Sequence, residues 1–411
     1  MNNKKAELKR NLSLTLITFY GLGNILGAGI YVLVGKVAGE AGYFAPLSFF
    51  IASIIAGISA FSYAELSARY PVSAGESVYV YEGFGRQKLS VMVGLLVGLA
   101  GIVSAATIAH GFVGYMQVFI DLPGWLMMTL LILALGALAA WGISQSVRVA
   151  AFLTLAEAAG LLIIIVVGAD QIQNIGQLYE LVKQEEQALQ HGFSVAGIFF
   201  GAFLAFYAYI GFEDMVNVAE EVKDPQRTMP RAILLCVIIS MILYSMVSLV
   251  SVSVLTPEQL SKTDAPLAAV YYQATGREPI MISFIGVFAV INGALIQIIM
   301  ASRIFYGMAS RGWLPGFLSE ISPATHTPIK STMLTVLLLM FFALLLPMVA
   351  LAEFTSSLVL LIFVLVNLSL VRIKRRQPRP DKVRVYPMWL PQLGFVTSLS
   401  FLCIELVAGF L

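Results

Sequence analysis

Glycines and acids within uncharged, apolar stretches are the residues of this sequence that could do chemistry. Residues 12–35 read LSLTLITFYGLGNILGAGIYVLVG, with Gly23, Gly27 and Gly29 near the middle. A glycine inside a helix costs about 1 kcal/mol relative to alanine, so this spacing predicts a helix that unwinds at 27–29. Its freed amides and carbonyls could hold a charged small molecule. Close packing between helices through small residues explains the same glycines equally well.

A second interruption is predicted in residues 193–222, FSVAGIFFGAFLAFYAYIGFEDMVNVAEEV. Gly211 lies among aromatic residues there, and Glu213 and Asp214 follow at once. An acid inside a membrane span costs about 2.5–3.5 kcal/mol on insertion scales, so it faces a cavity or a partner. We therefore expect a polar site at this break, although the aromatic residues alone are compatible with plain core packing.

Three ionisable residues in apolar runs are candidates for binding and releasing a proton: Glu157, Glu213 and His110. Histidine titrates near neutral pH. The alternatives are an acid packed against a partner and a neutral histidine hydrogen-bonded in the core. Both cysteines lie in apolar runs, and no group of His, Cys, Asp or Glu has the spacing of metal ligands. We expect no metal, no cofactor and no catalytic residue.

The elements that position these residues are membrane-spanning helices. Of the 411 residues, 59% are hydrophobic and 12% are charged, about half the charged share of a soluble domain. Apolar runs of roughly 20 residues span a bilayer as helices. The sequence predicts an all-α polytopic protein with about eleven spans: 12–35, 43–66, 88–118, 125–142, 147–168, 193–219, 231–254, 280–308, 331–350, 354–371 and 393–411.

The basic residues predict the orientation. With a cytoplasmic N-terminus, only four of the 25 Lys and Arg fall in outer segments: Lys36, Lys183, Lys262 and Arg277. Cytoplasmic loops carry the excess of basic residues, so this orientation is favoured and an odd number of spans puts the C-terminus outside. We expect a multi-pass protein of the cell (inner) membrane, in contact with the lipid bilayer and without a nucleic-acid partner.

The two glycine-interrupted helices are the first and the sixth span, and this offset of five predicts two halves of opposite orientation. The organisation is then a cytoplasmic tail (1–11), a first repeat of helices 1–5 (12–168), an external loop (169–192), a second repeat of helices 6–10 (193–371), a basic cytoplasmic linker (372–392) and an additional helix 11 (393–411). Paired interruptions in two such halves are the best sequence pointer to a transporter site.

Four stretches resemble the amino acid–polyamine–organocation superfamily, and its bacterial amino acid permeases in particular. The inner loop carries Ala74 and Glu76-Ser77 where the family is usually richer in glycine, and Arg311 stands where an acid is more usual. The stretches are GLGNILGAGI (21–30), YAELSARYPVSAGESVYVY (63–81), YIGFEDMVNVAEEVKDPQRTMPRAI (209–233) and ASRIFYGMASRGWLP (301–315).

The resemblance implies a five-plus-five inverted repeat, the LeuT-like fold, with discontinuous helices 1 and 6. Its site would bind the carboxylate of an amino acid through the amides of Ala28, Gly29 and Ile30. The carbonyls at the breaks would bind the ammonium, and Tyr207 would be the gate that covers the substrate. The substrate-binding residues implied are Ile25, Gly27, Ala28, Gly29, Ile30, Phe206, Tyr207, Tyr209, Ile210 and Gly211.

The expected function is secondary active transport of amino acids by alternating access, coupled to protons. A neutral substrate is expected, because no side chain is clearly reserved for a charged one. An exchanger of the same fold is the alternative within transport, and a membrane-embedded enzyme or sensor is the alternative outside it.

Glu65 and Arg69 are spaced for a surface pair on one helix. A bond across an inner gate to the region of Glu220, Glu221 and Lys223 is the other interpretation.

Overall fold

The computed structural model describes residues 12–27, 29–72, 75–141, 147–172, 195–322, 325 and 327–408. The predicted tail 1–11, Ala28, most of the external loop 169–192 and the last three residues of the predicted helix 393–411 therefore lie outside the described residues.

Helices make up the described part of the chain, together with one isolated bridge between Leu12 and Val222. Up to residue 172 the helices are α1 (Leu14–Leu26), α2 (Gly29–Ala41), η1 (Gly42–Phe44), α3 (Ala45–Arg69), α4 (Gly75–Phe84), α5 (Gln87–Met116), α6 (Gly124–Trp141), α7 (Val147–Val167) and α8 (Ala169–Ile172). They continue as α10 (Val195–Phe206), η2 (Tyr207–Tyr209), η3 (Glu213–Glu221), α11 (Pro225–Val254), α12 (Pro257–Lys262), α13 (Pro266–Thr275), α14 (Ile280–Ser310), η4 (Gly316–Ser319), α15 (Ile329–Leu345), α16 (Met348–Arg376) and α17 (Trp389–Ala408).

The apolar runs of the sequence are helical throughout the described residues. Six helical stretches are long and apolar enough to cross a membrane: Leu14–Arg69, Gln87–Met116, Ala196–Ala219, Pro225–Val254, Ile280–Ser310 and Met348–Arg376. Four shorter apolar helices lie at Gly124–Ala140, Phe152–Val167, Ile329–Leu345 and Trp389–Ile404. The predicted all-helical architecture, with several helices long and apolar enough to cross a membrane, is confirmed for the described residues.

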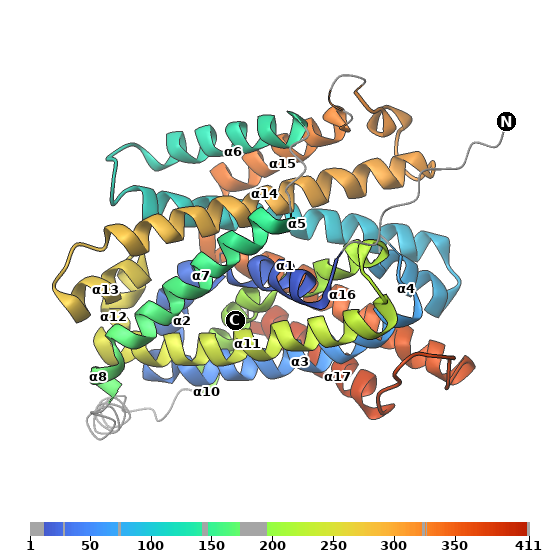
Figure 1. Ribbon diagram of the computed structural model, residues 1–411, viewed down its shortest axis with the longest axis horizontal. Helices are drawn as coiled ribbons and strands as arrows, with labels where there is room; N and C mark the ends of the chain where they lie inside the picture. Colours follow the sequence, from blue (N-terminus) through green and yellow to red (C-terminus); the bar gives the residue numbers. More distant parts are fainter. Residues whose placement is uncertain are drawn as a thin grey trace.

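The helices form one bundle with α1 near its centre and with α6 beside α15 at one edge (Figure 1). α1 packs against α7 and α11. The most extensive packing between helices joins α3 to α11 and α5 to α14. Large apolar side chains such as Phe152, Leu337 and Phe284 remain more than half exposed. Exposed apolar surface of this extent is typical of helices that face lipid.

The short helices α4 and α12 between the long ones were not predicted. α4 packs against α16, α5 and η3, and α12 packs against α2. Gly75 at the start of α4 has no room for a side chain, because a Cβ there would lie 2.4 Å from Val216 Cγ2. This close approach of α4 to η3 brings Glu76, the next residue, into the bundle.

Glu65 and Arg69 do pair, with 2.6 Å between Arg69 Nη2 and Glu65 Oε1, but the surface location was wrong. Both side chains are buried, and Lys374 of α16 adds a second cation 2.8 Å from Glu65 Oε2. The backbone amide of Tyr386 also donates to Glu65 Oε2, at 2.9 Å. The carboxylate of Glu65 therefore joins α3, α16 and the basic linker. Its buried negative charge is compensated by two cations and a backbone amide.

Candidate functional site

The first predicted span is divided between two helices, α1 and α2, and Gly27 after α1 keeps helical backbone angles (φ −56°, ψ −41°). α1 ends at Leu26 and α2 begins at Gly29. A Cβ on Gly29 would lie 2.3 Å from Cα of Ala208, far inside ordinary contact distance. Only glycine lets the backbone at the start of α2 approach the backbone of η2 this closely.

The second interruption follows α10. The chain turns through η2, becomes extended at Ile210 (ψ 137°), and passes Gly211 at φ 129°. This conformation is rare for residues with a side chain, and a Cβ on Gly211 would lie 2.9 Å from the carbonyl carbon of Asn24. The breaks therefore meet each other: Gly29 contacts Ala208, and Gly211 contacts Asn24.

Peptide carbonyls at the breaks already accept hydrogen bonds from the protein. Tyr244 Oη donates to the carbonyl of Ile25 at 2.7 Å, and the amide of Ile210 donates to the carbonyl of Tyr207 at 3.1 Å. Asn24 Nδ2 donates to the carbonyl of Gly211 at 3.0 Å. These hydrogen bonds hold the peptide groups of the two breaks in place.

The aromatic residues of the second break are buried. Tyr207 reaches α5, where its hydroxyl lies 3.0 Å from Ser104 Oγ and donates to the Ser104 carbonyl at 3.1 Å. Phe206 packs edge-on against Phe363 of α16, with 5.8 Å between ring centroids. Tyr209 packs against Tyr244. Tyr207 thus ties the break in α10 to α5.

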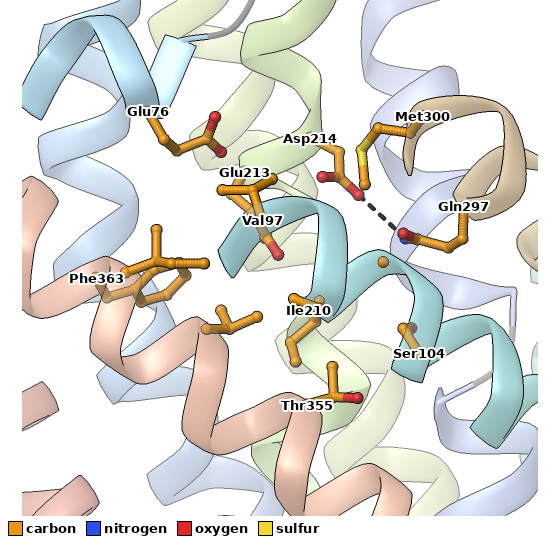
Figure 2. Close-up of a pocket in the computed structure, with 14 residues that line it drawn as sticks. Glu76, Val97, Ser104, Ile210, Glu213, Asp214, Gln297, Met300, Thr355 and Phe363 are labelled. Atoms are coloured by element: carbon orange, nitrogen blue, oxygen red, sulfur yellow. Dashed lines mark hydrogen bonds between the residues drawn. The ribbon is translucent and has the colours of Figure 1, made fainter. Parts of the chain in front are cut away.

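A small cavity begins at the second break. Ile210 is the predicted binding residue that lines it, and Figure 2 shows the acids Glu76, Glu213 and Asp214 towards one end and Ser104 and Thr355 towards the other. The lining residues are Glu76, Val97, Ala100, Gly101, Ser104, Ile210, Glu213, Asp214, Gln297, Met300, Thr355, Val359, Ile362 and Phe363.

Hydrogen bonds hold the two acids of the break in place. Asp214 Oδ2 accepts from Asn24 Nδ2 at 2.8 Å and from Gln297 Nε2 at 3.1 Å. Glu213 Oε2 accepts from the amide of Gly211 at 2.9 Å. Asp214 therefore links η3 to α1 and α14, and Glu213 stabilises the turn at Gly211.

Glu76 joins these acids from α4, which lies between the long helices α3 and α5. It is 2% exposed, and its Oε1 has no hydrogen-bond partner among the described residues. Burial raises the pKa of Glu76 to about 8. The sequence analysis did not select Glu76, Asp214 or Gln297, although Glu76 stood out as a departure from a glycine-rich loop.

The other two proton candidates lie elsewhere. Glu157 of α7 is buried, with Oε1 3.4 Å from Asn292 Nδ2 of α14 and Oε2 without a partner among the described residues. His110 of α5 is half-buried, with Nε2 3.1 Å from the carbonyl of Leu346. Neither residue lines the cavity, so the structure brings only Glu213 of the three candidates to it.

Comparison with known proteins identifies a family to which this sequence is similar. The family described as amino acid permease matches residues 12–411. The chain is 31% identical over 398 residues to a vacuolar cationic amino acid transporter 4 of Arabidopsis thaliana, covering 92% of this chain and 65% of the relative. It therefore spans just under two thirds of that transporter's length.

Two relatives from Bacillus subtilis are covered more fully. The branched-chain amino acid permease BcaP is 27% identical over 396 residues, which cover 90% of this chain and 82% of the permease. The methylthioribose transporter is 26% identical over 396 residues, which cover 92% of this chain and 84% of the transporter.

Proposed function

Because this chain belongs to the amino acid permease family, a family of transporters and not of enzymes, we propose that it moves amino acids across the cell membrane by alternating access. The observation that carries this proposal is the meeting of two interrupted helices, with Gly29 against Ala208 and Gly211 against Asn24. Unwound backbone inside a membrane is tolerated where protein or a cavity surrounds it, and here a cavity begins at Ile210.

The proposed architecture is a five-plus-five inverted repeat, with α1–α2 and α10–η2 as its equivalent discontinuous helices. The N-terminus is cytoplasmic and the C-terminus external in this proposal. Its support is the 25 basic residues, of which all but four fall in the inner segments.

The proposed substrate site holds the amino acid between the breaks. The start of α2, with the amides of Gly29 and Ile30, presents the positive end of a helix to the carboxylate. In this proposal the carbonyls of Ile25, Tyr207 and Ile210 accept hydrogen bonds from the ammonium. Tyr207 covers the substrate, and its side chain moves away when its hydrogen bond to Ser104 opens.

Transport is proposed to be coupled to protons, with Glu213 as the first candidate because it lies at both the break and the cavity. Glu157 and His110 are the further candidates. An exchanger that returns one substrate for another is the alternative. The sequence analysis predicts a neutral substrate. The relatives' names include both a cationic amino acid transporter and a branched-chain amino acid permease.

Uptake by proteoliposomes tests the proposal. The purified protein is reconstituted, and a panel of labelled neutral, acidic and basic amino acids is offered with and without an imposed pH gradient. A second series is preloaded with unlabelled substrate. Uptake that needs the gradient supports a proton symporter, whereas uptake that needs preloading supports an exchanger. No uptake of any amino acid under either condition would refute the proposed function.

A further inference from the structure

The end of α16 and the segment that joins it to α17 carry a strongly basic surface. Residues 372–388, together with residues 81–88 around the turn from α4 to α5, expose eight basic side chains and two acidic ones, Glu82 and Asp381. We call this surface the linker patch. Its basic residues are Arg86, Lys88, Arg372, Arg375, Arg376, Arg379, Lys382 and Arg384.

The protein does not neutralise the linker patch. Among the described side chains, none of its eight basic residues lies within ion-pair distance of a carboxylate. Two basic residues elsewhere on the predicted inner side are paired: Arg227 Nε lies 3.8 Å from Asp224 Oδ2, and Lys330 Nζ lies 2.5 Å from Glu320 Oε2. The excess positive charge is therefore concentrated at the linker.

Buried bonds hold the linker against α3. Arg69 Nη1 donates to the carbonyl of Gln377 at 3.0 Å, just after α16 ends. Further along, the amide of Tyr386 donates to Glu65 Oε2 at 2.9 Å, and the ring of Tyr386 lies 5.1 Å from that of Phe61. Because both ends of residues 377–386 are anchored, their basic side chains are presented on a frame that loses little freedom when a ligand binds.

Two arginines of α16 bring the turn after α4 into the same surface. The guanidinium of Arg372 lies 4.2 Å over the ring of Phe84, and Arg376 Nη1 donates to the carbonyl of Glu82 at 3.4 Å. A guanidinium has five N–H donors in a planar fork that matches the oxygens of a phosphate. One hydrogen bond to a carbonyl leaves most of these donors available to a ligand.

Exposed apolar surface begins directly beside the linker patch. Trp389, Leu393 and Val396 lie on one face of α17 and are 57%, 39% and 53% exposed. Tryptophan is enriched where a membrane meets water. α4 and the start of α17 lie at one end of the bundle (Figure 1), and both pack against α16. The basic side chains are thus at the level of the lipid headgroups, next to a face suited to lipid tails.

We infer that the linker patch binds the phosphate groups of anionic phospholipids in the adjacent leaflet. Clusters of about four to eight basic residues beside a membrane helix are typical of surfaces that bind anionic lipid. A soluble polyanion would meet the same charge but would leave Trp389 and the apolar face of α17 without a partner. The inference goes beyond the proposed transport function and does not depend on it.

Quenching of Trp389 fluorescence tests the inference. Trp389 is kept as the single tryptophan by replacing the other three with phenylalanine, and the protein is reconstituted in nanodiscs of phosphatidylcholine. Part of the lipid is exchanged for brominated phosphatidylglycerol or, in a parallel series, brominated phosphatidylcholine. Bromine quenches tryptophan on contact, so stronger quenching by the anionic lipid is the expected result. The difference should shrink at high salt, because salt screens exposed charges.

Two triple variants locate the effect. Each basic residue near an anionic surface contributes roughly fivefold in affinity, so removal of three from the linker should lower the preference for phosphatidylglycerol roughly tenfold or more. The linker variant combines Arg379→Gln, Lys382→Gln and Arg384→Gln. The control removes the same charge on the same predicted side but outside the linker patch, and it should keep the preference. It combines Arg227→Gln, Arg311→Gln and Lys330→Gln.

Three results would overturn the inference. One is equal quenching by the two lipids in the protein with an unaltered linker, and another is an equal loss of preference in the two triple variants. The third is relief of quenching by inorganic phosphate that replaces chloride at equal ionic strength, since a soluble anion would then be the ligand. If the linker variant does not fold, the comparison of the two lipids decides by itself.

The result is independent of the transport proposal. Both leaflets of a nanodisc have the same composition, so the orientation of the chain does not affect the quenching. Absence of amino acid uptake would refute the proposed function while preferential quenching by phosphatidylglycerol still supported the lipid site. Equal quenching with normal uptake would refute the lipid site alone.

Discussion

Replacing Gly29 by alanine should separate the two breaks and impair substrate binding. The new Cβ would lie 2.3 Å from Cα of Ala208, whereas ordinary contact begins at 3.4 Å. The start of α2 and η2 must therefore move apart by about 1.1 Å, the difference between these two distances. Both contacting segments are backbone, so no side-chain rotation can relieve the clash.

The cost follows from the clash. Overpacking of this kind costs about 1–3 kcal/mol. If this cost is borne by the arrangement that binds substrate, affinity falls by roughly 5- to 150-fold, since 1.4 kcal/mol corresponds to a factor of ten. Because the proposed amides and carbonyls lie on the two segments that separate, the loss should fall on binding as well as on stability.

The assay compares two alanine variants in the same proteoliposomes. Gly307→Ala is the control, because a Cβ on Gly307 in α14 meets nothing within 4 Å and alanine favours a helix. Uptake and binding affinity are measured for each variant, together with thermal unfolding of the purified protein. If Gly29→Ala binds and transports as well as Gly307→Ala, the close approach of the breaks is not part of the site and the reasoning fails.

Three further substitutions test other parts of the structure. Glu213→Gln should flatten the pH dependence of uptake, and an unchanged profile would remove Glu213 as the coupling acid. Glu65→Gln should lower the free energy of unfolding by about 3–5 kcal/mol, because it leaves two buried cations without their carboxylate; Glu320→Gln, in an exposed pair, should cost at most about 1 kcal/mol, and equal losses would contradict this. Since burial raises the pKa of Glu76 from 4.5 to about 8, its contribution to stability is complete below pH 4.5 and is lost as the pH rises to about 8. Glu76→Gln should therefore reduce the fall in unfolding temperature between pH 5 and pH 8, and an identical fall in both proteins would show that Glu76 does not titrate there.

The apolar helices and the interruption at Gly211 followed from local sequence. An apolar run without charge has one stable backbone arrangement in lipid, because a helix satisfies every peptide group within the segment. The glycines predicted the breaks because a residue such as Gly211, at φ 129°, sits in a conformation that other residues rarely adopt. Likewise, a separation of four residues predicted the pair of Glu65 and Arg69.

Tertiary structure alone decided what surrounds these elements. Lys374 meets Glu65 across 309 positions, Gln297 meets Asp214 across 83, and Tyr244 reaches the carbonyl of Ile25 across 219. No local pattern encodes such partners, because they depend on how helices far apart in the chain pack against one another. The same packing converts Glu76 from a loop residue into a buried acid at the cavity.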